Sequence, residues 1–233
     1  MSLKDRMMIS EKRRVFNYSP LLFVPIVNDD TPNGRYYETP TGERFPSVTT
    51  VLGRVLDNSK SLDKWRERVG EEEANRVSNR AKFRGSAIHS LAESYLSNDP
   101  DYKNKTTPIN LETFNKIKPI LDEHVGLIMG IELPLYSHHL HTAGRTDLLA
   151  EYDGRISIID FKTSKKSKDS KDILSYFLQA TAYGEMVEER YPKILVPQIV
   201  IVISVDHDQT QTFVRERIDY KEQMVRVFTE GKL

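Results

Sequence analysis

The chain has 233 residues, of which 38% are hydrophobic and 29% charged, a composition typical of a globular protein. No apolar run approaches the roughly 18 residues of a membrane-spanning helix, so we expect a soluble protein. The formal net charge of zero means that nucleic acid, if bound, must contact local basic patches. Cysteine is absent, which excludes disulfides, thiol catalysis and iron–sulfur clusters held by cysteine.

Residues 1–20 are predicted to form a basic arm of low order. This arm lacks the apolar core of a signal peptide and carries acids that a transit peptide usually avoids. We therefore expect a cytoplasmic location in a bacterial or phage-infected cell, or the mitochondrial matrix if a targeting segment has been removed. Strands are expected next in LLFVPIV (21–27), RYYET (35–39) and ERF (43–45), the last two on either side of a turn-like PTG.

Several helices are predicted to follow. One begins after Ser47, which stands where an N-cap would, ahead of apolar residues at helical spacing. A charge-rich helix is expected over 60–78 and an amphipathic helix over 80–97, leading into an exposed, mobile loop at 97–108. Residues 111–130 are also predicted to be helical, with a kink or break at Pro119.

The C-terminal half has the pattern of a sheet with one long helix. Strands are predicted at 131–140, 144–152, 155–163, 197–205 and 212–218, and a helix at 172–190. We therefore expect a single α/β domain in which helices pack against a sheet formed by residues 126–233.

The second and third of these strands are predicted to form a hairpin. The Asp-Gly pair at 153–154 is the strongest short-range signal for a two-residue type I′ turn. Tyr152 then faces Arg155, and because opposed residue numbers have a constant sum, Asp147 is predicted to lie directly opposite Asp160. Two carboxylates are thus expected to meet on one patch of the sheet.

Opposed carboxylates require a compensating positive charge, since their Cβ atoms lie only about 5 Å apart. Lys162 lies on the same face as Asp160, one pleat further along the strand. Mg²⁺ or Mn²⁺ would suit two carboxylate oxygens at this spacing, with the Phe161 carbonyl as a further ligand, and would support phosphodiester hydrolysis together with Lys162. The alternative is a structural salt bridge from Lys162 to both acids.

Four short motifs follow one another along the chain: R-G-S-A-I-H-S-L-A-E at 84–93, G-R-T-D at 144–147, D-F-K-T at 160–163 and Q-A-T-A-Y at 179–183. In this order they resemble motifs of the PD-(D/E)xK nuclease superfamily, in its RecB-like branch. F-P-S-V-T-T-V-L at 45–52 is similar to the mitochondrial genome maintenance exonuclease group and its phage relatives.

The resemblance implies a restriction-endonuclease-like fold. Its mixed sheet would be flanked by helices, and the hairpin and helices of residues 21–125 would form an N-terminal elaboration that shapes a DNA channel. The implied activity is exonucleolytic hydrolysis of single-stranded DNA with Mg²⁺ or Mn²⁺. The alternatives are an endonuclease or a double-strand end-resecting nuclease with the same site, and a catalytically silent DNA-binding module.

The resemblance also assigns roles to residues of the site. Asp147 and Asp160 would bind metal, Lys162 would be catalytic, and His89 would lie beside the metal. The first acidic residue of the family pattern is matched less clearly, with Glu132 as the candidate. No phosphate-loop motif is present, so a fused helicase motor is not expected.

Another set of polar residues is expected to contact DNA. The helix-start hydroxyls of residues 47–50 could bind a phosphate, although Ser47 is equally suited to cap the helix. The lysines of the 165–171 loop could meet the DNA backbone or simply be solvated. The full DNA-binding set comprises Ser47, Thr49, Thr50, Arg84, Thr163, Lys165, Lys166, Gln179 and Tyr183.

Other polar and aromatic groups are given structural roles. His138, His139 and His141 are not expected to hold a metal, because adjacent strand positions point to opposite faces. Aromatic residues such as Tyr36, Tyr37 and Trp65 could stack on bases, with core packing as the default. The acids of residues 71–73 are expected to form a solvated helix face.

Overall fold

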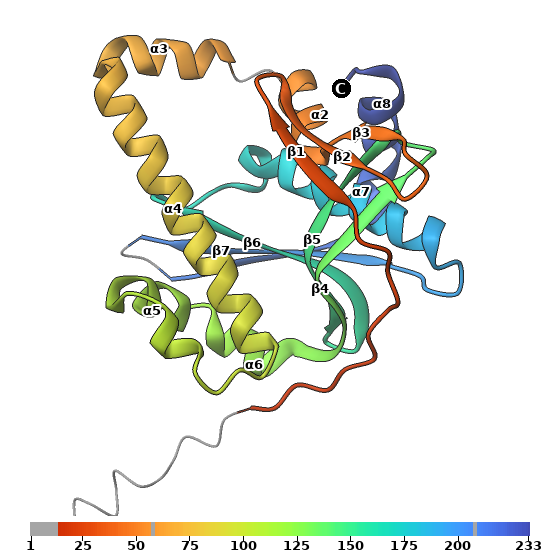
Figure 1. The fold of residues 1–233 in the computed structure, drawn as a ribbon. Coiled ribbons are helices and arrows are strands. Elements are labelled where there is room, and N and C mark those ends of the chain that lie inside the picture. The colour runs from red at the N-terminus through yellow and green to blue at the C-terminus, as the bar shows by residue number, and fades with distance from the viewer. Residues whose placement is uncertain (1–13, 57–58, 207–208) are drawn as a thin grey trace, which may run out of the picture.

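A mixed five-stranded sheet forms the centre of the protein in the computed structural model, which describes residues 14–56, 59–206 and 209–233 (Figure 1). Its strands, in spatial order, are β4 (Val125–Ser137), β5 (Thr142–Tyr152), β6 (Arg155–Ser164), β7 (Gln198–Val205) and β8 (Gln211–Glu216). The pair β6–β7 is parallel and the other neighbouring pairs are antiparallel. This confirms the expected mixed α/β sheet.

Helices cover both faces of this sheet. Figure 1 shows α2 (Val48–Val55), α7 (Leu174–Arg190) and α8 (Ile218–Glu230) above the sheet, and α5 (Pro108–Asn115) and α6 (Lys118–His124) below it. The short 3₁₀ turn η2 (Ser170–Ile173) precedes α7. None of the helices in the described ranges is long and apolar enough to cross a membrane.

Each face of the sheet has its own hydrophobic core. Leu149 and Ile158 belong to the core beneath α7 and α8, whereas their neighbours Leu148 and Ile159 belong to the core formed with α4 (Glu71–Leu96), α5 and α6. Adjacent residues serve opposite cores because side chains alternate along a strand. By the same alternation, Asp160 on β6 lies on the α7 face.

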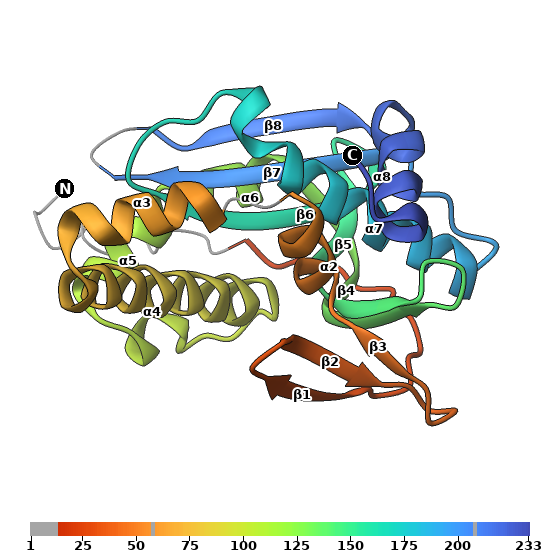
Figure 2. The ribbon, with the colours of Figure 1, turned by 90° about the horizontal axis from the view of Figure 1, so that it is seen from above.

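A second, three-stranded sheet precedes α2. It consists of β1 (Val27–Thr31), β2 (Gly34–Glu38) and β3 (Arg44–Pro46), and Figure 2 shows it set apart from the main sheet. Its strands β2 and β3 contact β5. Strands β2 and β3 match the expected RYYET and ERF strands. The strand predicted at 21–27 is wrong apart from Val27, because residues 21–26 join no strand ladder.

The helices after α2 are divided differently from the prediction. The break lies at Gly70, between α3 (Ser59–Val69) and α4 (Glu71–Leu96), and not between 78 and 80. Gly70 has φ of 86°, a left-handed conformation that glycine adopts readily and that interrupts a helix. Since residues 77–81 contain neither glycine nor proline, α4 continues through the predicted boundary.

The segment from 97 to 130 also departs from the prediction. The loop contains a 3₁₀ turn, η1 (Tyr102–Lys105), in which Tyr102 is buried, so it is not an entirely exposed loop. The break between α5 and α6 precedes Pro119, which lies in the first turn of α6, where the missing N–H costs nothing. Residues 125–130 begin strand β4 and are not helical, because their apolar side chains fill the sheet core.

Part of the expected N-terminal arm is well packed. Residues 1–13 lie outside the described ranges, but Phe16 is buried and its main chain forms two hydrogen bonds with the side chain of Asn98. The amide of Ser19 donates to the carbonyl of Ile128 in β4. The prediction of low order is therefore wrong for residues 14–20.

Candidate active site

The β5–β6 hairpin has the predicted turn and the predicted register. Asp153 and Gly154 have φ angles of 51° and 76°, as a type I′ turn requires at both central positions. Tyr152 pairs with Arg155, and the register continues unchanged for five residue pairs.

The paired register ends at Leu148 and Ile159, one step before the two aspartates. Beyond this point β5 stays with β4 while β6 continues along β7, and Figure 1 shows the two strands diverging. The amide of Phe161 donates to Asp147 Oδ2 at 2.8 Å. The prediction that Asp147 and Asp160 form a directly opposed ladder pair is therefore wrong, because a carboxylate takes the place of the main-chain acceptor.

The two aspartates are held by helices that reach the opening of the ladder from different sides. From α4, His89 Nδ1 lies 3.2 Å from Asp147 Oδ1. From α7, Gln179 Nε2 donates to Asp160 Oδ1 at 3.3 Å. Figure 1 shows α4 running obliquely from α3 towards α5 and α6, so that its middle passes the end of the ladder. The opening thus brings together groups that an intact sheet would keep apart.

Lys162 completes this arrangement on β6. Its Nζ lies 2.5 Å from Asp160 Oδ2, which confirms that the two side chains share a face. The ammonium group also lies 5.2 Å from the centre of the Tyr176 ring on α7. Asp160 is only 2% exposed, so this pair is a desolvated one.

Glu132 contributes a third carboxylate through an unusual backbone conformation. Its neighbours pair normally with β5, as Ile131 with Leu148 and Leu133 with Thr146, but Glu132 itself has φ of 48°. A left-handed residue other than glycine within a strand is a strained feature of the kind found at functional sites. Metal-binding atoms of His89, Glu132 and Asp147 all lie within 4.8 Å of one another.

The carboxyl groups of the site differ in their pKa values. Burial opposes ionisation of Asp147, but the hydrogen bond and charge of His89 outweigh it and hold the pKa of Asp147 below its usual value. Burial raises the pKa of Asp160 to about 6, and burial together with the charge of Asp147 raises the pKa of Glu132 to about 7. Burial lowers the pKa of Lys162, but Asp160 and Asp147 raise it more, so Lys162 stays an ammonium.

These residues fit a divalent cation. Asp160 Oδ2 is buried and paired with Lys162, so a divalent cation would balance the charge of the remaining carboxylates, Asp147 and Glu132. Carboxylate oxygens are the preferred ligands of Mg²⁺, and Mn²⁺ also accepts an imidazole nitrogen. Within the described part of the chain, His89, Glu132 and Asp147 are the one group of three candidate metal ligands.

His89, Glu132 and Asp147 line a cavity of about 520 Å³, called the acidic cavity below. Other residues of α4, α7 and β5 and of the β1–β2 hairpin also line it. Tyr183 lines it beside Gly144, where a Cβ atom would lie 2.7 Å from the Tyr183 hydroxyl oxygen. The glycine of G-R-T-D is thus what allows Tyr183 to approach β5. Gln179 and Tyr183 both line this cavity, and their contact with DNA stays a prediction.

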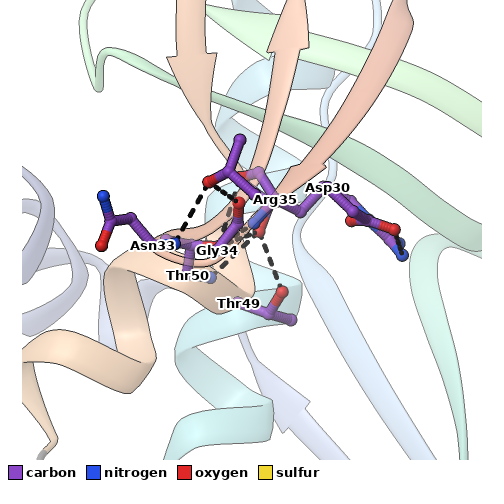
Figure 3. Close-up of polar contacts among 8 residues, drawn as sticks. Asp30, Asn33, Gly34, Arg35, Thr49 and Thr50 are labelled. Carbon is purple, nitrogen blue, oxygen red and sulfur yellow. Dashed lines mark hydrogen bonds and ion pairs between the residues drawn. The ribbon is translucent and has the colours of Figure 1, made fainter.

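The hydroxyl groups at the start of α2 are engaged within the protein. Ser47 accepts a hydrogen bond from the amide of Thr50, as an N-cap should. Figure 3 shows Thr50 Oγ1 bridging to β2, where it accepts from the amide of Arg35 and donates to the carbonyl of Arg35. The structure therefore supports the capping role for Ser47, while Thr49 lines the cavity.

The other predicted DNA-binding residues lie around a second cavity, of about 920 Å³. Arg84, Thr163 and Lys165 line this cavity, and Arg84 forms an ion pair with Asp206. Lys166 is exposed in the loop after β6, where its amide donates to the hydroxyl of Ser164.

The histidine-rich turn and the aromatic residues have structural contacts. His138 Nδ1 lies 3.3 Å from Glu43, and the ring of His138 packs edge-on against Phe45. Tyr37 is buried in a small core, although it also lines the acidic cavity, whereas Tyr36 and Trp65 are half-buried.

Two basic residues of the site were missed from the sequence. Arg145 Nη1 lies 3.8 Å from Glu132 Oε2, and Arg35 of β2 lines the same cavity. Arg145 lies within G-R-T-D, so the motif itself carried a signal. No sequence signal pointed to Arg35, because only the tertiary fold brings the β1–β2 hairpin next to β5.

A mixed α/β sheet with an aspartate and a D-x-K motif at an opening in its ladder is the arrangement of a nuclease domain. The chain belongs to the PD-(D/E)XK nuclease superfamily, whose family model matches residues 43–230. This confirms the resemblance of the motifs and the expected restriction-endonuclease-like fold.

The chain is also similar to individual proteins. Mitochondrial genome maintenance exonuclease 1 of Mus musculus is 30% identical over 130 residues, which cover 53% of this chain and 38% of the relative. The Homo sapiens protein of that name is 28% identical over 173 residues, 68% of this chain and 49% of the relative. The chain thus matches about half or less of these relatives. A putative exonuclease from Eubacterium rectale aligns with a TM-score of 0.40 and 15% identity, over 66% of this chain and 68% of that one.

Proposed function

We propose that the chain is a metal-dependent DNA exonuclease that hydrolyses phosphodiester bonds of single-stranded DNA with free ends. One observation carries the proposal: Asp147, Asp160 and Lys162 meet where the β5–β6 ladder opens, with His89 and Glu132 around them. A purely structural salt bridge would need neither the strained backbone of Glu132 nor a third carboxylate.

His89, Glu132 and Asp147 would hold the cation, with Asp160 beside them and the Phe161 carbonyl as a candidate further ligand. When bound, Mg²⁺ or Mn²⁺ supplies the charge that lowers the pKa of water and stabilises negative phosphoryl oxygens.

The protein's own groups orient the site and add charge. The Phe161 amide and the His89 ring fix the orientation of Asp147, and the Gln179 amide does so for Asp160. Because Lys162 remains protonated beside Asp160, it acts as a hydrogen-bond donor to a phosphate oxygen and does not take a proton from water. Such prepositioned groups are what phosphoryl transfer requires.

The DNA specificity and the need for a free end rest on similarity. The curated relatives carry the name exonuclease, and the sequence motifs resemble those of nucleases acting on single strands. The lysine-rich loop after β6 and Thr163 would contact the DNA backbone.

The test compares end-labelled linear and circular single strands with Mg²⁺, Mn²⁺ or a chelator. We expect linear strands to shorten only with metal and circles to stay intact. Cleavage in chelator would contradict the metal requirement, cutting of circles would indicate an endonuclease, and a preference for duplex ends would indicate an end-resecting enzyme. Binding without any cleavage would indicate a silent DNA-binding module.

A matched pair of variants ties the activity to this site. Asp160→Asn should abolish cleavage while the protein stays folded, whereas Asp219→Asn, an exposed aspartate of α8 outside the cavity, should cleave normally. Normal cleavage by the Asp160→Asn variant would show that the chemistry occurs elsewhere.

A further inference from the structure

The second cavity lies on the opposite side of α4 from the acidic one. It is bounded by the N-terminal half of α4, by α5 and by the C-terminal ends of β6 and β7. The two cavities adjoin at one position of α4, where Arg84 lines the second cavity and Gly85 the first. Thr163, which follows Lys162 on β6, also lines the second cavity. A strand bound in the acidic cavity would enter the second cavity at Arg84 and Gly85.

Exposed apolar side chains line this second cavity. Phe83 on α4 is 77% exposed and Ile109 on α5 is 70% exposed. Leaving a phenylalanine in water has no benefit for folding. A flat apolar surface of this kind is what an unpaired base stacks on.

The same cavity offers unfilled donors for an anion. Nε and Nη2 of Arg84 are buried and lack a hydrogen-bond partner within the described ranges, although Nη1 pairs with Asp206. Arg80 and Lys165, which also line the cavity, form no salt bridge in the described part of the chain. Unfilled guanidinium donors beside an exposed ring match the phosphate and base of one nucleotide.

We propose that this cavity binds one unpaired nucleotide of the substrate strand, with its base against Phe83 and Ile109 and its phosphate at Arg84. A base in a duplex is stacked and paired and cannot lie against Phe83, so the cavity selects single strands. The proposal rests on the proposed function, since it assumes that DNA reaches Lys162.

Binding of fluorescein-labelled single strands tests this cavity in the full chain carrying Asp160→Asn, which prevents cleavage. Adding Phe83→Ala should weaken binding about 5- to 100-fold, the range for loss of one stacked base. The matched control is Leu195→Ala, a similarly exposed apolar residue outside both cavities. Equal affinities of the Phe83→Ala and Leu195→Ala proteins would overturn the proposal.

An abasic scan identifies the nucleotide concerned. One base at a time is removed from the oligonucleotide, and we expect a loss of affinity at one position that disappears in the Phe83→Ala protein, because the two partners of one contact are not additive. If the affinity loss at each abasic position is the same whether or not the protein carries Phe83→Ala, the assignment is contradicted. If the chain instead bound no DNA and cleaved none, the proposed function itself would fail, which is a different outcome.

Discussion

The two ends of the β5–β6 hairpin contain the same two strands but are built differently. At the turn, Asp153 and Gly154 close a regular ladder in which main-chain groups bond one another. At the other end the ladder stops, and a side chain of Asp147 accepts the Phe161 amide. With the proposed function, the turn end serves stability and the open end would serve chemistry, so substitutions at each end should affect different measurements.

After Asp160→Asn, which should abolish cleavage, the largest effect is expected for Asp147→Asn at the open end. The variant loses the carboxylate that His89 and Phe161 hold, and we expect cleavage to fall about 10³- to 10⁴-fold, as for other essential aspartates. Mn²⁺ should raise the melting temperature of the unmodified chain by binding the native state, and it should not raise that of the variant. The Asp219→Asn protein serves as control, and a Mn²⁺ shift retained by Asp147→Asn would contradict the assignment.

Lys162→Met should have the next largest effect. Removing the ammonium group should reduce the cleavage rate about 10²- to 10³-fold, the range for loss of one charge-stabilising donor. Metal binding should remain, because the candidate ligands are untouched. Calorimetric Mn²⁺ titration together with single-turnover cleavage separates the two effects, and an unchanged rate would mean that Lys162 only balances the charge of Asp160.

Glu132 provides a comparison of two substitutions at one position. Both Glu132→Gly and Glu132→Ala remove the carboxylate and should reduce cleavage about 10- to 100-fold. Since φ is 48°, the glycine variant should be about 1 kcal/mol more stable than the alanine variant. Denaturant unfolding of both proteins measures the difference, and equal stabilities would show that the left-handed conformation is not retained.

The smallest effect on cleavage is expected for Gly154→Ala at the turn end. A Cβ atom there meets nothing within 4 Å, so the cost comes from the backbone, whose φ is 76°, and should be about 1 kcal/mol of unfolding free energy. The rate of cleavage should not change. A rate that falls with stability would show that the two ends of the hairpin are coupled.

The sequence predicted the regular end of the hairpin well and the open end less well. Alternation along the strands and the Asp-Gly turn fixed the register and put Lys162 beside Asp160, as the structure shows. The end of the ladder could not be foreseen, because it depends on β5 following β4 while β6 follows β7. The same holds for Glu132, whose left-handed conformation carries no clear signal in the local sequence.

Helix boundaries show the same limit. The start of α2 was predicted because Ser47 is a local signal, and the structure confirms the cap. The predicted helix boundary between residues 78 and 80 is wrong, since the charged stretch over residues 60–80 has no clear apolar period and the break depends on the conformation of Gly70. His89 was nevertheless assigned to the site, because its motif carried that information independently of the helix bounds.

The location of the metal ion tests the central claim most directly. In crystals grown with Mn²⁺, anomalous scattering should place one or more ions between His89, Glu132 and Asp147, with ligand distances of about 2.0–2.3 Å. Such a peak should be absent from crystals of the Asp147→Asn protein. Anomalous density at the His138 turn alone, or no density at the open end of the hairpin, would contradict the account.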